Sequence, residues 1–229
     1  MNLDEFIINF TNIKNRINRA CELVSRDPNT VKLLPVTKTH SKWAIEYALK
    51  LGLEAVGENR VQEVREKQPL IRQTCFWELI GHLQSNKVNE AVRYFDRIQS
   101  VDSFKLIRKL NRACSQINKK LPVFLQCNSG EDPNKYGFSV SEMSGALEAV
   151  LEASHLKCEG LMTIAPLEKD SNRAKECFNS LFIIRESLVK DFQYPLPELS
   201  MGMTQDLEIA IASGSTMIRV GTALFGERP

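Results

Sequence analysis

Hydrophobic positions along the chain follow two alternating patterns. Short apolar runs of strand type lie at 31–36, 55–56, 76–80, 97–101, 122–127, 157–164, 198–201 and 217–220. Between them lie longer segments whose apolar residues recur every three or four positions, which is typical of amphipathic helices. The alternation predicts βαβ units around a parallel sheet. With eight strand candidates, we expect an α/β fold with a single (β/α)8 TIM-type barrel rather than an open sheet.

One additional helix is expected before the first strand, over residues 3–25. Its apolar positions share one helical face and are Leu3, Phe6, Phe10, Ile13, Ile17 and Val24. Other helices are expected at 41–51, at 59–68, from Ser85, after 101 through 118, from Ser139 or Ser141 to about 154, at 173–189 and at 206–213. No low-complexity linker or short repeat interrupts the pattern, so we expect one domain over residues 1–229.

Residues that typically begin or end helices and strands support several of these boundaries. Ser41 is a suitable N-cap, and Gly52 and Gly214 are suitable helix ends. Pro35 lies inside the first strand candidate and cannot donate a hydrogen bond to a sheet. We therefore expect Pro35 to lie at an edge or an irregularity of the sheet.

Charge and composition exclude several classes of partner. The chain has 30 basic and 28 acidic residues, a net charge of +2, and so lacks the electrostatic footprint of a nucleic-acid binder. Its start, MNLDEFIINF, is acidic where a signal peptide is basic. No apolar stretch reaches the roughly 18 residues typical of a membrane span. We expect a cytoplasmic protein without nucleic-acid or membrane partners.

The six cysteines are irregularly spaced, and none forms a C-x-x-C pair. Several lie in apolar runs, as Cys127 does. This usage favours small buried side chains in a reducing compartment over a disulfide framework or a zinc site. We expect no metal.

Polar residues gather where the strand candidates end, which in a barrel is the face that carries active sites. Lys38 directly follows the first strand. Partial burial and nearby cations would lower the pKa of its amine and free it to attack a carbonyl. The alternative is a lysine that simply extends to solvent at the barrel rim.

The seventh and eighth strand ends resemble phosphate-binding loops, which barrels often build there. Ser200 and Thr204 offer hydroxyls, and Thr222 offers a hydroxyl and an N–H group. Gly202 and Gly221 would let backbone N–H groups approach an anion. The alternative is that these glycines only permit tight turns.

Arg219 lies inside an apolar strand, where a charge needs a partner. Either a strand-end carboxylate or an acceptor on a bound ligand would serve. Asn59 and His82 are weaker candidates, because a lone histidine is more often structural than catalytic. Glu58 is a possible general base or a solvated rim carboxylate.

Seven motifs in order carry a family resemblance. They are LLPVTKTH around Lys38, VGENRVQE from Val56, WELIGHLQSNK from Trp77, NSGEDPNKYGF from Asn128, GLMTIAP from Gly160, LSMGMTQDLEIAI from Leu199 and IRVGTALFGER from Ile218. With these motifs the sequence resembles the YggS/PROSC family of pyridoxal phosphate homeostasis proteins along nearly its whole length. Thr204 and Gln205 stand where relatives often have serine and an acidic residue.

The resemblance implies an alanine-racemase-like barrel that binds pyridoxal 5′-phosphate (PLP) as a covalent aldimine to Lys38. It places Ser200 and the Gly221–Thr222 turn at the phosphate, with Thr204 and the Met201–Gly202 backbone beside them. It places Arg219 at the pyridine nitrogen. It also places Asn59, His82 and Met162 in motifs that line the same pocket.

The same resemblance bears on turnover. Arginine stays protonated and can only donate to the ring nitrogen, which leaves the ring a weaker electron sink. Racemases of this fold also carry a second, β-rich domain. We therefore predict a monomer that binds and exchanges PLP in vitamin B6 homeostasis without appreciable turnover. It would affect amino-acid and keto-acid pools indirectly, with PLP-accepting apoenzymes as possible partners.

Two alternatives stay open. One is a low-activity PLP-dependent amino-acid racemase that uses Lys38 with His82 or a water as bases. The other is a barrel for a phosphate ligand, in which Lys38 contacts the phosphate as a point charge.

Overall fold

The strands of the chain close into a parallel barrel. The structure, a computed structural model, describes residues 1–166 and 171–227, so Arg228 of the last motif lies outside the described residues. Within them the strands are β1 (Lys32–Pro35), β2 (Ala55–Glu58), β3 (Phe76–Leu79), β4 (Arg97–Val101), β5 (Leu121–Gln126), β6 (Leu156–Met162), β7 (Glu198–Ser200) and β8 (Met217–Val220). They form one eight-stranded parallel sheet in the order β1-β8-β7-β6-β5-β4-β3-β2. An isolated parallel bridge between Val36 and Gly57 joins its two ends, which confirms the expected barrel.

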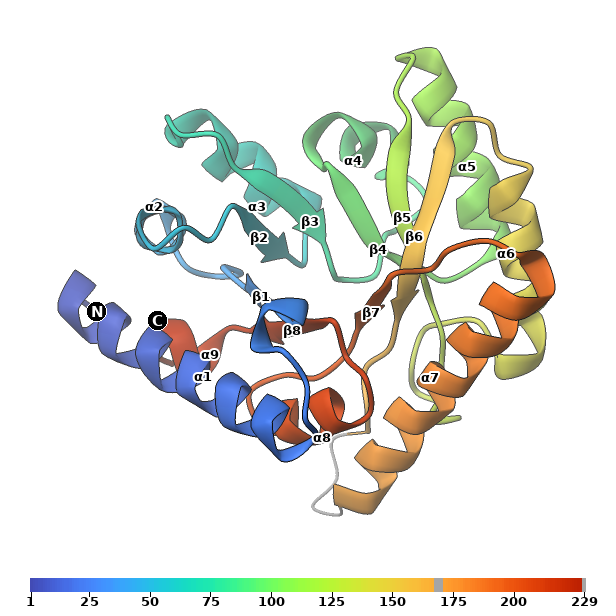
Figure 1. Ribbon diagram of the computed structural model, residues 1–229. Coiled ribbons are helices and arrows are strands. Elements are labelled where there is room, and N and C mark those ends of the chain that lie inside the picture. Colours follow the sequence, from blue (N-terminus) through green and yellow to red (C-terminus); the bar gives the residue numbers. More distant parts are fainter. Residues whose placement is uncertain (167–170, 228–229) are drawn as a thin grey trace.

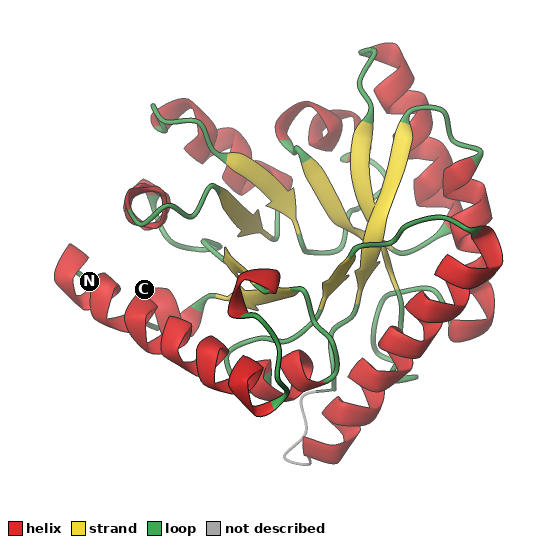
Figure 2. Cartoon of the chain, viewed as in Figure 1, coloured by secondary structure: helices red, strands yellow, loops and turns green. Residues whose placement is uncertain are grey.

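Helices surround the strands (Figures 1 and 2). They are α1 (Leu3–Leu23), α2 (Lys42–Lys50), α3 (Val61–Lys67), α4 (Val88–Tyr94), α5 (Phe104–Gln116), α6 (Met143–Leu151), α7 (Ser171–Phe192), α8 (Leu207–Ala212) and α9 (Thr222–Phe225). Short 3-10 turns lie at Pro28–Thr30, Gln68–Leu70 and Val140–Glu142. The additional helix α1 packs on α8 and α9 and brings the two termini together (Figure 1). There Phe6 stacks on Phe225 with ring centroids 5.3 Å apart.

Pro35 lies where the barrel closes between β1 and β2, which are joined by an isolated bridge rather than by a ladder of hydrogen bonds. This position suits a residue without an N–H group. The Val36 N–H donates to the Val220 carbonyl on β8 (2.8 Å), and the Thr37 N–H donates to the Gly57 carbonyl beyond β1 (3.1 Å). Because successive strand residues face alternate neighbours, the proline nitrogen falls on the β2 side. The pairing of β1 with β2 is accordingly reduced to the single bridge.

Several expected boundaries need correction. The helix expected from Ser85 begins at Val88, because residues before it form a turn in which the Lys87 N–H donates to the Gln84 carbonyl (2.9 Å). Ser41 is the N-cap of α2, but its side chain makes no capping hydrogen bond. Ser139 forms a full capping box with Glu142. The short helix α9 was not expected from the sequence.

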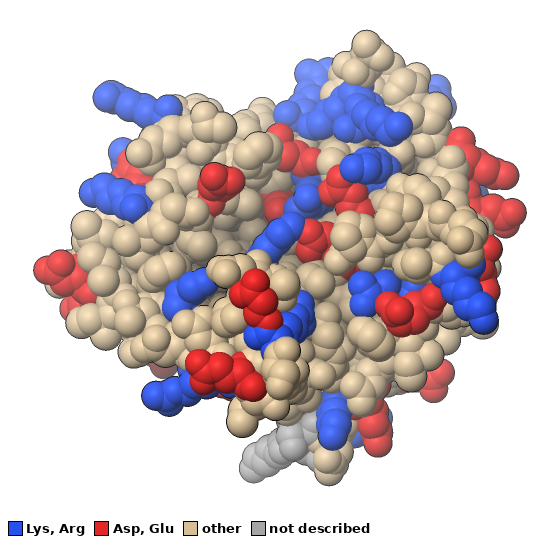
Figure 3. Space-filling view, viewed as in Figure 1, with Lys and Arg blue, Asp and Glu red and all other residues tan. Residues whose placement is uncertain are grey.

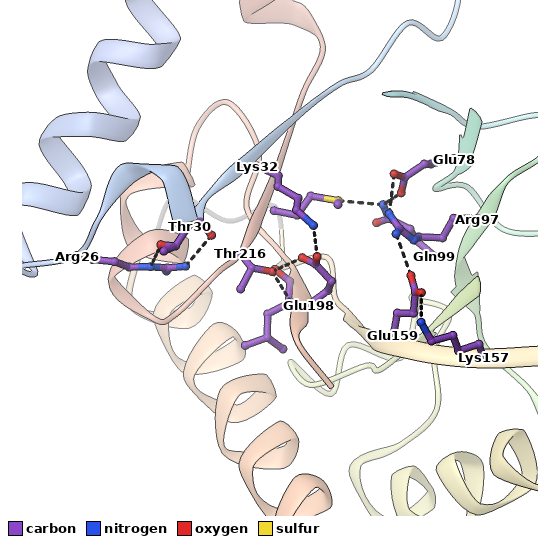
Figure 4. A network of polar contacts seen from close by, with 12 residues as sticks. Arg26, Thr30, Lys32, Glu78, Arg97, Gln99, Lys157, Glu159, Glu198 and Thr216 are labelled. Atoms are coloured by element: carbon purple, nitrogen blue, oxygen red, sulfur yellow. Dashed lines mark hydrogen bonds and ion pairs between the residues drawn. The ribbon is translucent and has the colours of Figure 1, made fainter. Parts of the chain in front are cut away.

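The inside of the barrel is apolar in one part and polar in the other. Its apolar part is a buried cluster of Leu34, Val36, Ile80, Phe124, Met162 and Met217. Its polar part is a hydrogen-bonded chain shown partly in Figure 4, in which Arg97 bonds Glu78 (2.8 Å) and Glu159 (2.9 Å). Gln99 joins the chain through Glu78 (2.6 Å). Burying these charges is tolerable only because each has a partner.

The cysteines and the surface complete the description. All six thiols are free, and all but the partly exposed Cys75 are buried. Burial raises the pKa of Cys75, Cys127 and Cys158 to about 12. On the face seen in Figure 3, basic and acidic side chains are intermixed. Among the described residues, no helix combines the length and the apolar character needed to cross a bilayer.

Candidate functional site

A cavity of about 580 Å³ lies where the strands end, which is the expected face of the barrel. Of the residues singled out in the sequence, those that line it are Lys38, Asn59, His82, Thr204, Arg219, Gly221 and Thr222. These residues follow β1, β2, β3, β7 and β8, apart from Arg219 within β8, so loops from distant parts of the chain meet at one place. The remaining lining residues are Val36, His40, Ile80, Gly81, Gln126, Tyr136, Ile164, Met203, Gln205 and Asp206.

The other four expected residues lie behind the cavity wall. Met162 belongs to the buried inner cluster, together with Val36 and Ile80, which do reach the cavity. Met201 packs in the outer core between sheet and helices. Ser200 is fully buried, and its hydroxyl donates to Gln99 Oε1 at 2.6 Å.

Gly202 shapes the loop that follows β7. Its φ is +93°, and a Cβ at this position would lie 2.4 Å from the Cβ of Ala210. Glycine is the residue that adopts a positive φ easily and has no Cβ to meet Ala210. Gly202 therefore permits both the tight turn and the close approach of α8. This supports the turn alternative at Gly202, while Gly221 and Thr222 begin α9 at the cavity wall.

Arg219 is held from behind by two neutral acceptors. Its guanidinium donates to the Ser200 hydroxyl (2.7 Å) and to the Thr163 carbonyl (2.8 Å). Burial lowers the pKa of Arg219 to about 10, against the attraction of Asp206, so the group is a cation at neutral pH. Within the described residues it forms no ion pair with a carboxylate, so the strand-end carboxylate considered above is not its partner. Its position is instead fixed through Ser200 and Gln99 by the polar chain of the barrel interior.

The Thr204 loop is clamped from two sides. Asp206 accepts a hydrogen bond from the Met203 N–H at 2.6 Å. From helix α1, Arg16 donates to the Thr204 carbonyl (2.8 Å) and grips Glu208 of α8 with two bonds of 2.7 and 2.9 Å. The additional N-terminal helix thus holds a wall of the cavity.

His82 and Tyr136 form a stacked pair at the cavity. Their rings are 3.8 Å apart and nearly parallel, at 10°. His82 Nδ1 lies 2.6 Å from a carboxylate oxygen of Asp102, whose side chain is buried. Gly81 brings this loop against Asn59, because a Cβ on Gly81 would lie 2.5 Å from the Asn59 carbonyl oxygen. The histidine is therefore both structurally held and part of the cavity lining.

Lys38 is half-buried on a short loop. The residues beneath the loop include Glu58, which is fully buried and does not line the cavity. Its carboxylate accepts hydrogen bonds from Thr37 (2.6 Å) and Lys67 (2.7 Å). Burial raises the pKa of Glu58 to about 7, although Lys67 opposes the shift. Glu58 is thus neither a solvated rim carboxylate nor a group facing the ligand space.

Sequence reasoning missed Tyr136, Asp206 and Gln126 as lining residues. Tyr136 and Asp206 lie inside the motifs NSGEDPNKYGF and LSMGMTQDLEIAI, so a signal was present. That signal is weaker than at the other positions, because neither residue directly follows a strand. Gln126 ends β5 and bonds the Tyr136 carbonyl at 2.9 Å, which ties that loop to the barrel.

Comparison with known proteins assigns the fold and the family. Residues 8–229 match the family model of the alanine racemase N-terminal domain. The pyridoxal phosphate homeostasis protein of Aquifex aeolicus is 36% identical over 214 residues, covering 93% of this chain and 94% of the relative. That of Escherichia coli K12 is 33% identical over 230 residues, covering 99% and 98%.

Solved structures agree. PipY of Synechococcus elongatus PCC7942, in the structure with PLP bound, superposes with a TM-score of 0.81 at 35% identity, covering 92% of this chain and 100% of PipY. An unknown protein from Bifidobacterium adolescentis gives 0.92 at 32% identity, covering 97% and 95%. Alanine racemase of Clostridium difficile 630 gives 0.82 at 16% identity, covering all of this chain and 58% of the racemase, which shows a common barrel fold. The chain therefore belongs to the pyridoxal phosphate homeostasis protein family, which is built on the alanine racemase N-terminal domain.

Proposed function

We propose that this protein binds PLP in the 580 Å³ cavity and acts in vitamin B6 homeostasis by binding and exchanging it. The observation that carries the proposal is the meeting of Lys38 and Arg219 in one cavity with the Gly221–Thr222 turn. These groups match an aldehyde, a ring nitrogen and a phosphate respectively. PipY, which shares 35% of its aligned sequence with this chain, has been solved with PLP bound.

The residues present fit the cofactor. The cavity is within the usual 300–1,000 Å³ of small-ligand sites. Val36, Ile80 and Ile164 supply an apolar lining for a flat ring. Thr204 and Thr222 contribute hydroxyls for a phosphate. The Thr222 backbone N–H, in the first turn of α9, has no acceptor within the helix and can donate to the same phosphate. The expected roles of Asn59, His82 and Thr204 in binding are part of this proposal, with Ser200, Met162, Met201 and Gly202 supporting the wall from behind.

We further propose that Lys38 holds the cofactor covalently through a Schiff base. A primary amine is the group that reacts with an aldehyde, and Lys38 is a lysine of the cavity wall. When bound, PLP supplies an electron sink for carbanions at an amino acid's Cα. Arg219, held as a cation, can only donate to the ring nitrogen, which weakens that sink. This favours a binding and exchange protein with little turnover.

The proposal also takes the protein to be a cytoplasmic monomer made of one barrel domain, residues 1–229, that passes PLP to apoenzymes. The unpaired, mostly buried thiols support a reducing compartment. Light scattering of the purified protein tests the oligomeric state.

A spectral titration with PLP tests the site. Wild type should develop a Schiff-base band at about 420 nm that disappears on borohydride reduction, with the reduced adduct located on Lys38 by peptide mass spectrometry. Lys38→Ala should lose the band, whereas Lys42→Ala, an exposed control on α2, should keep it. A wild-type protein without the band, or a Lys38→Ala protein with an unchanged band, contradicts the covalent proposal. Sustained turnover of an amino acid that is lost in Lys38→Ala contradicts the binding-and-exchange proposal.

A further inference from the structure

The backbone that carries Lys38 is fixed on both sides by charged residues of the next βα unit. Thr37 precedes Lys38, and its hydroxyl donates to Glu58 Oε1 at 2.6 Å. Thr39 follows Lys38, and its N–H donates to Glu63 Oε2 at 2.7 Å. Glu58 ends β2, and Glu63 lies in α3, which follows β2 and packs beside it (Figure 1). The loop is therefore held through both residues that flank the lysine.

Lys67 joins these contacts into one network. Its side chain is only 11% exposed. Its ammonium donates to the Thr37 carbonyl (2.9 Å), to Glu58 (2.7 Å) and to Glu63 (3.1 Å). A lysine has three N–H donors, so each has an acceptor here. One buried cation thus links the Lys38 loop to both carboxylates.

Thr39 adopts a conformation that needs such support. Its φ is +66°, in the left-handed region that threonine rarely occupies. The side chain of a non-glycine residue crowds its own backbone in this region, so the conformation carries a steric cost. The bond from its N–H to Glu63 helps to hold this conformation, and the turn directs the residues on either side of it.

Stability alone does not explain the network. A buried ion pair is often no more stabilising than apolar residues of the same volume. Glu58 Oε2 is buried without a hydrogen-bond partner among the described residues, which adds to the cost. None of Glu58, Glu63 and Lys67 lines the 580 Å³ cavity, so they act on a ligand only through the loop they hold.

We propose that Lys67, together with Glu58 and Glu63, is a positioning set that aims the Lys38 amine at the aldehyde of the cofactor. The inference rests on the proposed function, because it assigns Lys38 the covalent role. In that reaction the amine nitrogen adds to the aldehyde carbon, one water leaves, and a C=N bond forms without any redox partner. Correct placement should speed this step, since misplacing a reacting group by an ångström has large kinetic effects.

The test measures the rate of Schiff-base formation at fixed PLP in the full-length protein. Lys67→Met should slow it by about tenfold or more, and Lys67→Arg, which can donate to the same acceptors, should recover part of the rate. Lys119→Met is the control, because Lys119, like Lys67, is a lysine that holds backbone: it donates to the carbonyls of Val92 (3.0 Å) and Phe95 (2.7 Å). Phe95 lies between α4 and the start of β4, at the end of the barrel away from the cavity, so this variant should react like wild type.

A second variant decides the case if Lys67→Met does not fold. Glu63 is 20% exposed, so Glu63→Ala removes the Thr39 anchor without leaving a deeply buried vacancy. It should also slow the reaction, while Glu66→Ala, an exposed change on the same helix, should not.

The outcomes separate the two proposals. If wild type forms a Lys38 adduct and the folded Lys67→Met and Glu63→Ala proteins react at the wild-type rate, the positioning inference is overturned and the proposed function stands. If wild type forms no adduct on Lys38, both fail.

Discussion

Two buried charged residues, Arg219 and Glu58, show how neighbouring groups decide whether a side chain reaches the cavity. Arg219 reaches it from β8 with its guanidinium bonded to Ser200 and Thr163. Glu58 stays below it, bonded to Thr37 and Lys67. Both were candidates in the sequence, Arg219 as a charge inside an apolar strand and Glu58 as a charge just after one. Which of them faces the cavity depends on neighbours far away in sequence.

Glu58 should make stability depend on pH. Its folded pKa is about 7, raised from the ordinary 4.5 by burial. Between pH 4.5 and pH 7 the Glu58 carboxyl is protonated in the folded protein and ionised in the unfolded chain, so folding takes up a proton. The contribution of Glu58 to stability is therefore present below about pH 4.5 and is lost as pH rises through 7. In urea unfolding, wild type should lose about 1–3 kcal/mol between pH 5 and pH 8 relative to Glu58→Gln. The exposed Glu54→Gln control should follow wild type, and identical pH dependence in wild type and Glu58→Gln would refute the prediction.

Gly202 should tolerate no side chain. In Gly202→Ala the new Cβ meets Ala210 at 2.4 Å and the φ of +93° is unfavourable for alanine. We expect a loss of about 2–4 kcal/mol in the free energy of unfolding. Gly52→Ala shares the positive φ, at +78°, but its Cβ would have no atom within 4 Å. Its cost should be only about 1–2 kcal/mol, and equal losses in the two variants would show that the clash is relieved.

At the scale of elements, α1 does more than cover the barrel. It packs on α8 and α9, and its Arg16 holds the Thr204 carbonyl beside the cavity. The sequence predicted this helix from its apolar face, because that face repeats at helical spacing. Its polar link to the Thr204 loop spans 188 residues and left no such periodic signal. The helix start predicted at Ser85 was wrong for a similar reason. Ser85 resembles an N-cap in the sequence but lies in the turn closed by the Lys87 N–H and the Gln84 carbonyl, and the helix begins at Val88.

Arg16→Ala should loosen the Thr204 loop at the cavity, with little effect on the stability of the fold. The Arg16–Glu208 pair is partly exposed, so the free energy of unfolding should fall by less than about 1 kcal/mol. The dissociation constant for PLP should rise by up to about fivefold, which corresponds to a loss of about 1 kcal/mol of binding free energy. Spectral titration measures this, with Arg19→Ala on the exposed side of α1 as the control. Equal affinities for the two variants would mean that α1 does not support the site.

At the scale of the whole molecule, one polar chain crosses the barrel interior. It runs from Arg219 through Ser200, Gln99 and Glu78 to Arg97, with the last part visible in Figure 4. The outer core, by contrast, is apolar and contains the buried thiols. The molecule therefore has an apolar shell between sheet and helices and a hydrogen-bonded interior behind the cavity.

The buried thiols should be unreactive in the folded protein. Thiolate is the nucleophile, and burial raises the pKa of Cys75, Cys127 and Cys158 to about 12. With an aromatic disulfide reagent at pH 8, we expect the partly exposed Cys75 to react slowly and the buried thiols to react only after denaturation. Rapid native reaction of several thiols would show that the core opens readily.

The sequence was enough to predict the alternation of strands and helices, including the bounds of β4 and β8, because its local periodicity reports which face of each element is buried. It also located Lys38, Arg219 and Thr222, because residues at strand ends of a barrel share one face. The folded chain was needed to show that Ser200 supports Arg219, that Tyr136 stacks on His82, and that Lys67 reaches the Lys38 loop. Those relations depend on distances between segments that are separate in the chain, and residue spacing does not encode such distances.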